Sequence, residues 1–189
     1  MRIVGGDLRG RALATPRDRS VRPTADRVRQ TIFDILAHAY GNPVTDARVL
    51  DLFAGTGAMG LEALSRGAAF ALFVDADVGA RGLIRQNADA LGLTGRTRIY
   101  RRDATRLGPI GPVAPFALAF ADPPYGRGLG EAALAAAVAG GWLAPGALAV
   151  LEESAAAEVA AVPGLERLQA RRIGDTQVVF HRAPAGRTG

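Results

Sequence analysis

The pattern of hydrophobic and polar positions predicts short buried strands that alternate with helices. The apolar runs with the length and composition of buried strands are residues 49–52, 70–74, 116–121 and 147–152. A further strand, with a basic sequence, is expected at 98–102. Helical spacing of apolar positions predicts helices at 58–66, 78–91 and 130–140. An earlier helix is expected to begin after Thr24, as its N-cap, and to end near residue 39. This alternation indicates an α/β fold with a mainly parallel sheet.

The two ends of the chain depart from the alternation. Residues 2–13 combine apolar positions with glycines, which is typical of a short hairpin. Residues 165–173 and 177–182 are expected to form a closing antiparallel hairpin. We therefore expect a basic N-terminal arm or hairpin at 1–22, one α/β domain with a seven-stranded sheet at 23–183, and a loose tail at 184–189.

A glycine-rich turn follows the first predicted strand. Glycine lets the backbone approach a ligand closely, and the turn exposes N–H groups at the start of a helix. The spacing Gly55-x-Gly57-x-x-Gly60 matches the fingerprint of dinucleotide-binding proteins. The spacing Asp51-x-x-x-Gly55-x-Gly57 equally matches the first motif of methyltransferases that use S-adenosylmethionine (SAM). The turn alone therefore leaves two ligand classes open.

The tetrapeptide Asp122-Pro123-Pro124-Tyr125 favours the second class. It follows the apolar run 116–121, at the end of a predicted strand. The prolines fix the backbone, so hydrogen-bond acceptors on Asp122 and Pro123 are pre-positioned. Tyr125 offers a face on which an unstacked base can lie. A dehydrogenase has no use for this arrangement, whereas an enzyme that methylates an exocyclic amino group does. The alternative is a rigid turn without chemistry.

Carboxylates recur at the ends of the predicted strands. Asp51, Asp75, Asp103 and Asp122 all lie at or near carboxyl ends, where open α/β sheets bind their ligands. Asp75 is placed to accept hydrogen bonds from ribose hydroxyls. Asp103 has a competing interpretation as the ion-pair partner of Arg101 or Arg102.

Composition narrows the chemistry further. The chain of 189 residues contains no cysteine, which excludes disulfides, thiolate metal sites and pyrimidine methylation through a cysteine nucleophile. With two histidines, no metal centre is expected. No apolar run is long enough to span a bilayer, and residues 1–7 lack the apolar core of a signal peptide. We therefore expect a cytoplasmic protein without a membrane partner.

The net charge of +5 and the pI of about 10.8 favour a polyanionic partner. All 23 basic residues are arginine, so coding bias is an alternative explanation for their number. Their distribution is more informative, because arginine and glycine together suit phosphate contacts. The residues expected to contact RNA are Arg9, Arg11, Arg17, Arg19, Arg22 and Thr24. The alternative for the arm is a solvated tail.

These motifs together resemble the class I, Rossmann-like SAM-dependent methyltransferases. More narrowly, the chain resembles the bacterial 16S ribosomal RNA guanine-N2 methyltransferases that modify guanine 966. That resemblance rests on Arg2–Arg11, on Arg22-Pro23-Thr24 and the helix after it, on Leu50–Gly57 with Glu62–Ala68, and on Asp122–Tyr125. It covers nearly the whole chain. Two positions depart from the family pattern: Asp75 stands where glutamate is usual, and Ala117 where an acid is frequent.

The resemblance implies roles for individual residues. The SAM site would comprise Asp51, Phe53, Gly55, Thr56 and Gly57 near the amino acid end, Asp75 and Ala76 at the ribose, and Asp103 and Ala104 at the adenine. The catalytic residues would be Asp122, Pro123, Pro124 and Tyr125. The implied partner is 16S ribosomal RNA within the 30S subunit or a late assembly intermediate, and the expected state is a monomer without metal.

Three other functions remain open on the sequence. The same tetrapeptide serves adenine-N6 and other amino methyltransferases that act on RNA or DNA. An NAD-dependent oxidoreductase would use the glycines but leave Asp122–Tyr125 without a role. A catalytically silent RNA-binding module would not need the acidic residue that each motif carries.

Overall fold

The computed structural model describes residues 1–16 and 23–186. Its seven strands form one sheet in the order β3-β2-β1-β4-β5-β7-β6. The strands are β1 (Arg48–Leu52), β2 (Phe70–Val74), β3 (Thr97–Tyr100), β4 (Phe116–Ala121), β5 (Leu143–Ser154), β6 (Glu166–Ile173) and β7 (Thr176–Arg182). The α-helices are α1 (Pro23–Ala39), α2 (Ala58–Ser65), α3 (Val78–Ala90) and α4 (Leu129–Ala139), with short 3₁₀ turns η1 (Thr94–Arg96) and η2 (Ala104–Arg106).

Strands β3, β2, β1, β4 and β5 run parallel, while β7 lies antiparallel between β5 and β6. The prediction of a mainly parallel sheet with an antiparallel C-terminal strand is thus confirmed. The chain winds outward from β1 through β2 to β3, then returns to place β4 on the other side of β1. This reversal makes the carboxyl ends of β1 and β4 the place where such sheets bind ligands.

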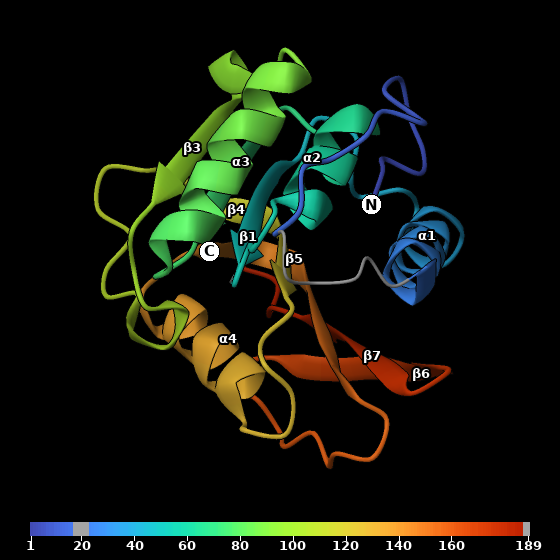
Figure 1. Ribbon diagram of the computed structural model, residues 1–189. Coiled ribbons are helices and arrows are strands. Elements are labelled where there is room, and N and C mark those ends of the chain that lie inside the picture. Colours follow the sequence, from blue (N-terminus) through green and yellow to red (C-terminus); the bar gives the residue numbers. More distant parts are fainter. Residues whose placement is uncertain (17–22, 187–189) are drawn as a thin grey trace.

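Helices cover both faces of the sheet, so the central strands are buried on both sides (Figure 1). Successive side chains of a strand point to opposite faces. Accordingly, Val49 packs in the cluster that holds α1, α2 and α3, while Leu50 packs in the cluster that holds α4. The apolar runs seen in the sequence are therefore continuous rather than alternating, as expected for parallel strands.

Several element boundaries differ from those expected, most of them by one or two residues. Helix α1 begins at Pro23, so Thr24 lies inside it instead of capping it; proline is favoured at a first helical position. Strand β3 ends at Tyr100, before Arg101. Strand β5 begins at Leu143 and pairs with β4 through a register shift, because Pro145 lacks an N–H donor and Gly146 takes a φ of 73°.

The N-terminal hairpin is reduced to a single bridge, between Arg2 and Ala12. Gly6 and Gly10 have φ of 73° and 88°, which interrupts extended pairing. The segment instead packs onto the domain beside α2 (Figure 1), and it buries Ile3 and Leu13 almost completely. The first sixteen residues therefore contribute to the core rather than forming a free arm.

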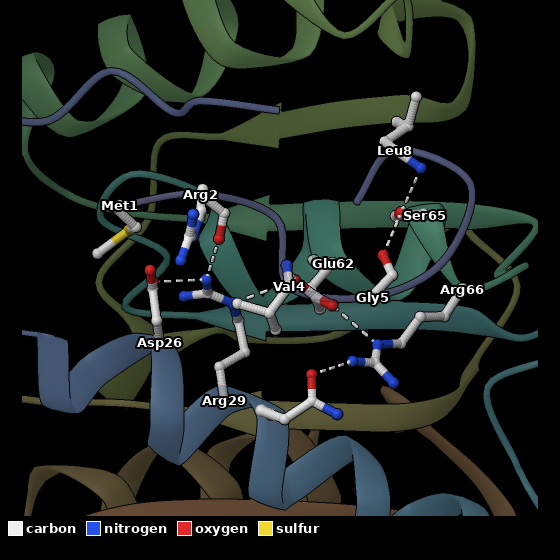
Figure 2. A network of polar contacts seen from close by, with 12 residues as sticks. Met1, Arg2, Val4, Gly5, Leu8, Asp26, Arg29, Glu62, Ser65 and Arg66 are labelled. Carbon is white, nitrogen blue, oxygen red and sulfur yellow. Dashed lines mark hydrogen bonds and ion pairs between the residues drawn. The ribbon is translucent and has the colours of Figure 1, made fainter. Parts of the chain in front are cut away.

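A buried polar network holds this segment in place (Figure 2). Glu62 of α2 is fully buried and pairs with Arg29 of α1 at 3.2 Å and with Arg66 at 2.8 Å. Its carboxylate also accepts the N–H of Val4 at 2.8 Å. Ser65 accepts the N–H of Leu8 at 3.0 Å. Two arginines thus balance the charge of Glu62. Its contacts join α2 to α1 and to the N-terminal segment.

Two further observations concern the expected partners. Across residues 1–16 and 23–186, no helix is long and apolar enough to cross a membrane. Three of the arginines expected to bind RNA, Arg17, Arg19 and Arg22, lie outside the described residues, as does the side chain of Thr24.

Candidate active site

The carboxyl ends of the parallel strands bring acidic side chains into one row. The last register pairs are Leu52 with Val74, Leu52 with Ala121, and Ala121 with Leu151. The next residues along are Asp75, Asp122 and Glu152. Neighbouring parallel strands lie about 4.8 Å apart. Asp122 and Glu152 therefore occupy adjacent places along this edge, while β1 separates Asp75 from Asp122. Asp103 follows the end of β3, farther along this edge.

The glycine turn after β1 has the backbone that its sequence demands. Gly55 and Gly57 have φ of 57° and 79°, and Phe53 also takes a positive φ of 58°. A bulky residue in this region stores strain and is held there by its surroundings. The N–H of Gly55 donates to Asp75 at 2.9 Å, so the turn is fixed to the end of β2.

Asp51 lies beneath this turn and is only 2% exposed. Its carboxylate accepts the N–H of Gly60 at 2.9 Å. Burial raises the pKa of Asp51 to about 8, and the nearby charge of Asp75 adds to this effect. A Cβ at Gly60 would lie 2.4 Å from the ring of Phe73, so glycine is required where α2 meets β2. Asp51 therefore stabilises the turn by bonding to the start of α2.

Asp75 and Asp103 are more accessible than Asp51. Asp75 is half-buried and also accepts the N–H of Asp77 at 2.8 Å, while the neighbouring Ala76 is exposed. Asp103 is exposed and caps η2 by accepting the N–H and hydroxyl of Thr105 at 2.9 and 2.7 Å. These bonds lower the pKa of Asp103, so it stays ionised.

The competing interpretation of Asp103 as an ion-pair partner is not supported. In the described part of the chain, the ion pairs join Arg29 to Asp26, and Arg29 and Arg66 to Glu62. Arg102 instead donates to the carbonyl of Leu107. The next residue, Ala104, is buried in the apolar cluster that includes α4.

The tetrapeptide after β4 is anchored by two neighbouring acids of β5. The hydroxyl of Tyr125 donates to Glu152, and the N–H of Gly126 donates to Glu153 at 2.9 Å. Asp122 and Pro124 are exposed, and Pro123 is buried. Burial, together with the charges of Glu152 and Asp122, raises the pKa of Tyr125, which keeps its hydroxyl protonated. Tyr125 as a whole remains 39% exposed.

Sequence reasoning missed the acids of β5 and Asn87 of α3. Glu152 lines a small cavity with Asp122, whose remaining walls are Ile32, Met59, Phe120, Ala121 and Val150. The rule that pointed to the other strand ends applies equally to Glu152, one residue beyond the register pair of β4 and β5. Asn87 is buried and donates to the carbonyls of Thr56 and Ala14 at 2.9 and 3.1 Å.

The N-terminal segment reaches the glycine turn directly. The hydroxyl of Thr56 contacts the sulfur of Met1 at 3.4 Å. Two of the arginines expected to bind RNA, Arg9 and Arg11, are exposed on this segment. Arg11 also donates to the carbonyl of Ala90 at the end of α3, at 2.9 Å. The structure thus places exposed positive charge on a segment that is joined to the turn.

In the described ranges, no group of three or more His, Cys, Asp or Glu side chains is arranged to hold a metal ion. The carboxylates of the row are spread along the sheet edge, and several accept backbone N–H groups.

Known proteins with similar sequences and structures bear on this site. The family described as Conserved hypothetical protein 95 matches residues 1–182. Ribosomal RNA small subunit methyltransferase D of Escherichia coli is 40% identical over 86% of this chain and 79% of its own. The protein of that name from Haemophilus influenzae is 32% identical, covering 80% of this chain and 78% of its own.

A solved Escherichia coli structure, whose description assigns it provisionally to the methyltransferases, has a TM-score of 0.81 and 35% identity, and the match covers 98% of each chain. The fold is thus that of the class I methyltransferases. By sequence and by structure, the chain belongs to the Conserved hypothetical protein 95 family, together with the small-subunit ribosomal RNA methyltransferases D.

Proposed function

We propose that this protein transfers a methyl group from SAM to the exocyclic N2 of a guanine in 16S ribosomal RNA of the small subunit. The main observation behind this proposal is the position of Asp122–Tyr125 beside the glycine turn, at the point where the strand order reverses. The names of the 32–40% identical relatives support the same reaction class and substrate. The cytoplasm, where ribosomal RNA is made in bacteria, is the proposed location.

The residues around the turn fit SAM. A Cβ at Gly55 would meet only the carbonyl oxygen of Phe53, at 3.9 Å, so there is open space above the turn for a ligand. Half-buried Asp75 offers carboxylate oxygens for a ribose diol, and ionised Asp103 offers an acceptor for an adenine amino group. Phe53, Thr56, Ala76 and Ala104 would complete the walls. When bound, SAM supplies the electrophilic methyl group.

Replacing Asp75 by alanine is expected to weaken SAM binding. The change removes a charged acceptor worth roughly 1.5–3 kcal/mol and releases the N–H of Gly55 from its partner. Calorimetry of SAM binding measures the loss. Asp77→Ala is the control, because Asp77 caps α3 through the N–H of Ala80 and is not assigned to the ligand. Equal SAM affinity in Asp75→Ala and wild type would contradict the assignment.

The chain's own groups then act on the target base. A guanine N2 amino group is a poor nucleophile because its lone pair is delocalised into the ring. The carboxylate of Asp122 and the carbonyl of Pro123 would each accept a hydrogen bond from one of its two N–H groups. These bonds would favour a pyramidal nitrogen. Tyr125 would stack against the flipped base. Its hydroxyl is bound by Glu152, so the ring is held in place before the base arrives.

We place RNA recognition partly on the N-terminal segment, whose Arg9 and Arg11 are exposed. Changing both to glutamine is expected to raise the KM for small subunits and leave SAM affinity unchanged. The slope of log affinity against log salt should flatten by about one unit for each phosphate group that the variant no longer neutralises. Deleting the whole segment is a poorer test, because Ile3 and Leu13 belong to the core.

The matched control changes Arg171 and Arg172 to glutamine. These residues carry the same charge on β6, at the other end of the sheet from β3. If only the β6 pair alters the KM and the salt slope, RNA recognition lies there and the N-terminal arginines are solvated charges.

The reaction itself is tested with small subunits and with late assembly intermediates as separate substrates. Nucleosides from digested RNA, analysed by mass spectrometry, are expected to contain N2-methylguanosine. N6-methyladenosine would instead assign the protein to the adenine methyltransferases. A thermal-shift comparison of SAM, S-adenosylhomocysteine and NAD separates both from an oxidoreductase, which would be stabilised by NAD.

A further inference from the structure

We propose that Glu152 is a specificity-determining residue that recognises guanine by accepting its N1–H while Asp122 accepts from the N2 amino group. This inference rests on the proposed function and adds to it the group that distinguishes guanine from adenine.

The placement of Glu152 beside Asp122 follows from the sheet. Ala121 and Leu151 are the last paired residues of β4 and β5, and Asp122 and Glu152 come next on each strand. Leu151 faces the α4 side, so Glu152, the next residue within β5, points toward α1 and α2. Both carboxylates line one cavity, whose walls include Ile32 and Met59. The cavity has room for no more than about one water molecule, so its meaning is that the two carboxylates lie side by side at the strand ends.

The hydrogen bond that Glu152 makes orients its side chain but uses only one of its two carboxylate oxygens. Its Oε1 accepts the hydroxyl of Tyr125, and no hydrogen bond to Oε2 is formed within residues 1–16 and 23–186. The pKa of Glu152 is raised overall, because burial raises it by more than the Tyr125 hydroxyl and the charge of Arg29 lower it. The side chain is thus oriented by Tyr125, and an oxygen remains for a ligand donor.

Guanine matches two adjacent carboxylates and adenine does not. The Watson–Crick edge of guanine carries donors at both N1 and N2, so each meets an acceptor. Adenine has an unprotonated N1, and its lone pair would face the carboxylate with no proton between them. A site built to accept a ligand proton strongly rejects the analogue that lacks it, because the site's own polar group is left unpaired. The arrangement therefore selects against adenine at the same step that positions the amino group.

The test compares wild type and Glu152→Gln on reconstituted small subunits that carry guanosine or 2-aminopurine riboside at the target position. 2-Aminopurine keeps the amino group on C2 but has an acceptor at N1. Wild type is expected to prefer guanine by on the order of 10–100-fold in kcat/KM. Glutamine keeps an acceptor for Tyr125 and offers an N–H to N1. Glu152→Gln should therefore lose activity on guanine, gain relative activity on 2-aminopurine, and bind SAM as wild type does.

Tyr125→Phe is the control for a merely structural role. It removes the hydroxyl that orients Glu152 and keeps the carboxylate, so the preference for guanine should shrink but remain, even if the rate falls. Equal use of both bases by wild type, or an equal loss on both bases in Glu152→Gln, overturns the role of Glu152. If the wild type methylates guanine in none of the particles, the proposed function itself is wrong. That outcome differs from the two results that would overturn only the role of Glu152.

Discussion

Replacing Asp122 by alanine is expected to lower turnover by about 10²–10³, the usual effect of removing one pre-positioned polar group from an active site. Asp122 follows β4, whereas the residues assigned to SAM lie at or after the ends of β1, β2 and β3. Cofactor affinity should therefore remain near the wild-type value while the chemical step is lost. Single-turnover methylation of small subunits measures the step, and calorimetry measures SAM affinity.

Asp122→Asn provides the graded control. Asparagine keeps the size of the side chain and one carbonyl acceptor but removes the negative charge. Its rate should lie between wild type and Asp122→Ala if the group acts by accepting a hydrogen bond. If Asp122→Ala methylates RNA at the wild-type rate, the tetrapeptide is a rigid turn and the chemistry lies elsewhere.

Much of the fold follows from local patterns in the sequence. The parallel strands are buried on both faces, and such strands must be continuously apolar, as at residues 70–74 and 116–121. Gly55 and Gly57 form the predicted turn after β1, with the positive φ that glycine permits. Once the strands are known to be parallel, the acids that follow them must share one edge. That geometry is why Asp75, Asp103 and Asp122 were predictable as a group at this edge.

Contacts between distant segments were not predictable in this way. The N–H of Val4 meets a carboxylate 58 residues away, and no local periodicity records that pairing. The N-terminal segment consequently looks like a free basic arm in the sequence, although it carries core residues. The burial of Asp51 and the bond between Tyr125 and Glu152 depend likewise on how helices and loops close over the strand ends.

Replacing Glu62 by leucine should produce the largest loss of stability among these variants. The change leaves Arg29, whose side chain is 3% exposed, with a buried charge. Within residues 1–16 and 23–186, its remaining polar contacts are Asp26 and the carbonyl of Arg2. Breaking a buried pair in this way costs about 3–5 kcal/mol. In a chain of this size, that corresponds to a fall in Tm of roughly 6–20 °C. Thermal unfolding by circular dichroism measures it.

The network also predicts where the loss will be felt. Val4 and Leu8 donate to α2, so hydrogen exchange at their amides should accelerate before the sheet opens (Figure 2). Asp26→Ala is the matched control, because Asp26 is 23% exposed and such pairs contribute about 1 kcal/mol or less. A double variant, Arg29→Leu with Glu62→Leu, should recover part of the loss, since no unpaired charge is left at Arg29. If Glu62→Leu unfolds as Asp26→Ala does, the N-terminal segment is held by its apolar residues alone, and the positions of Arg9 and Arg11 do not depend on this network.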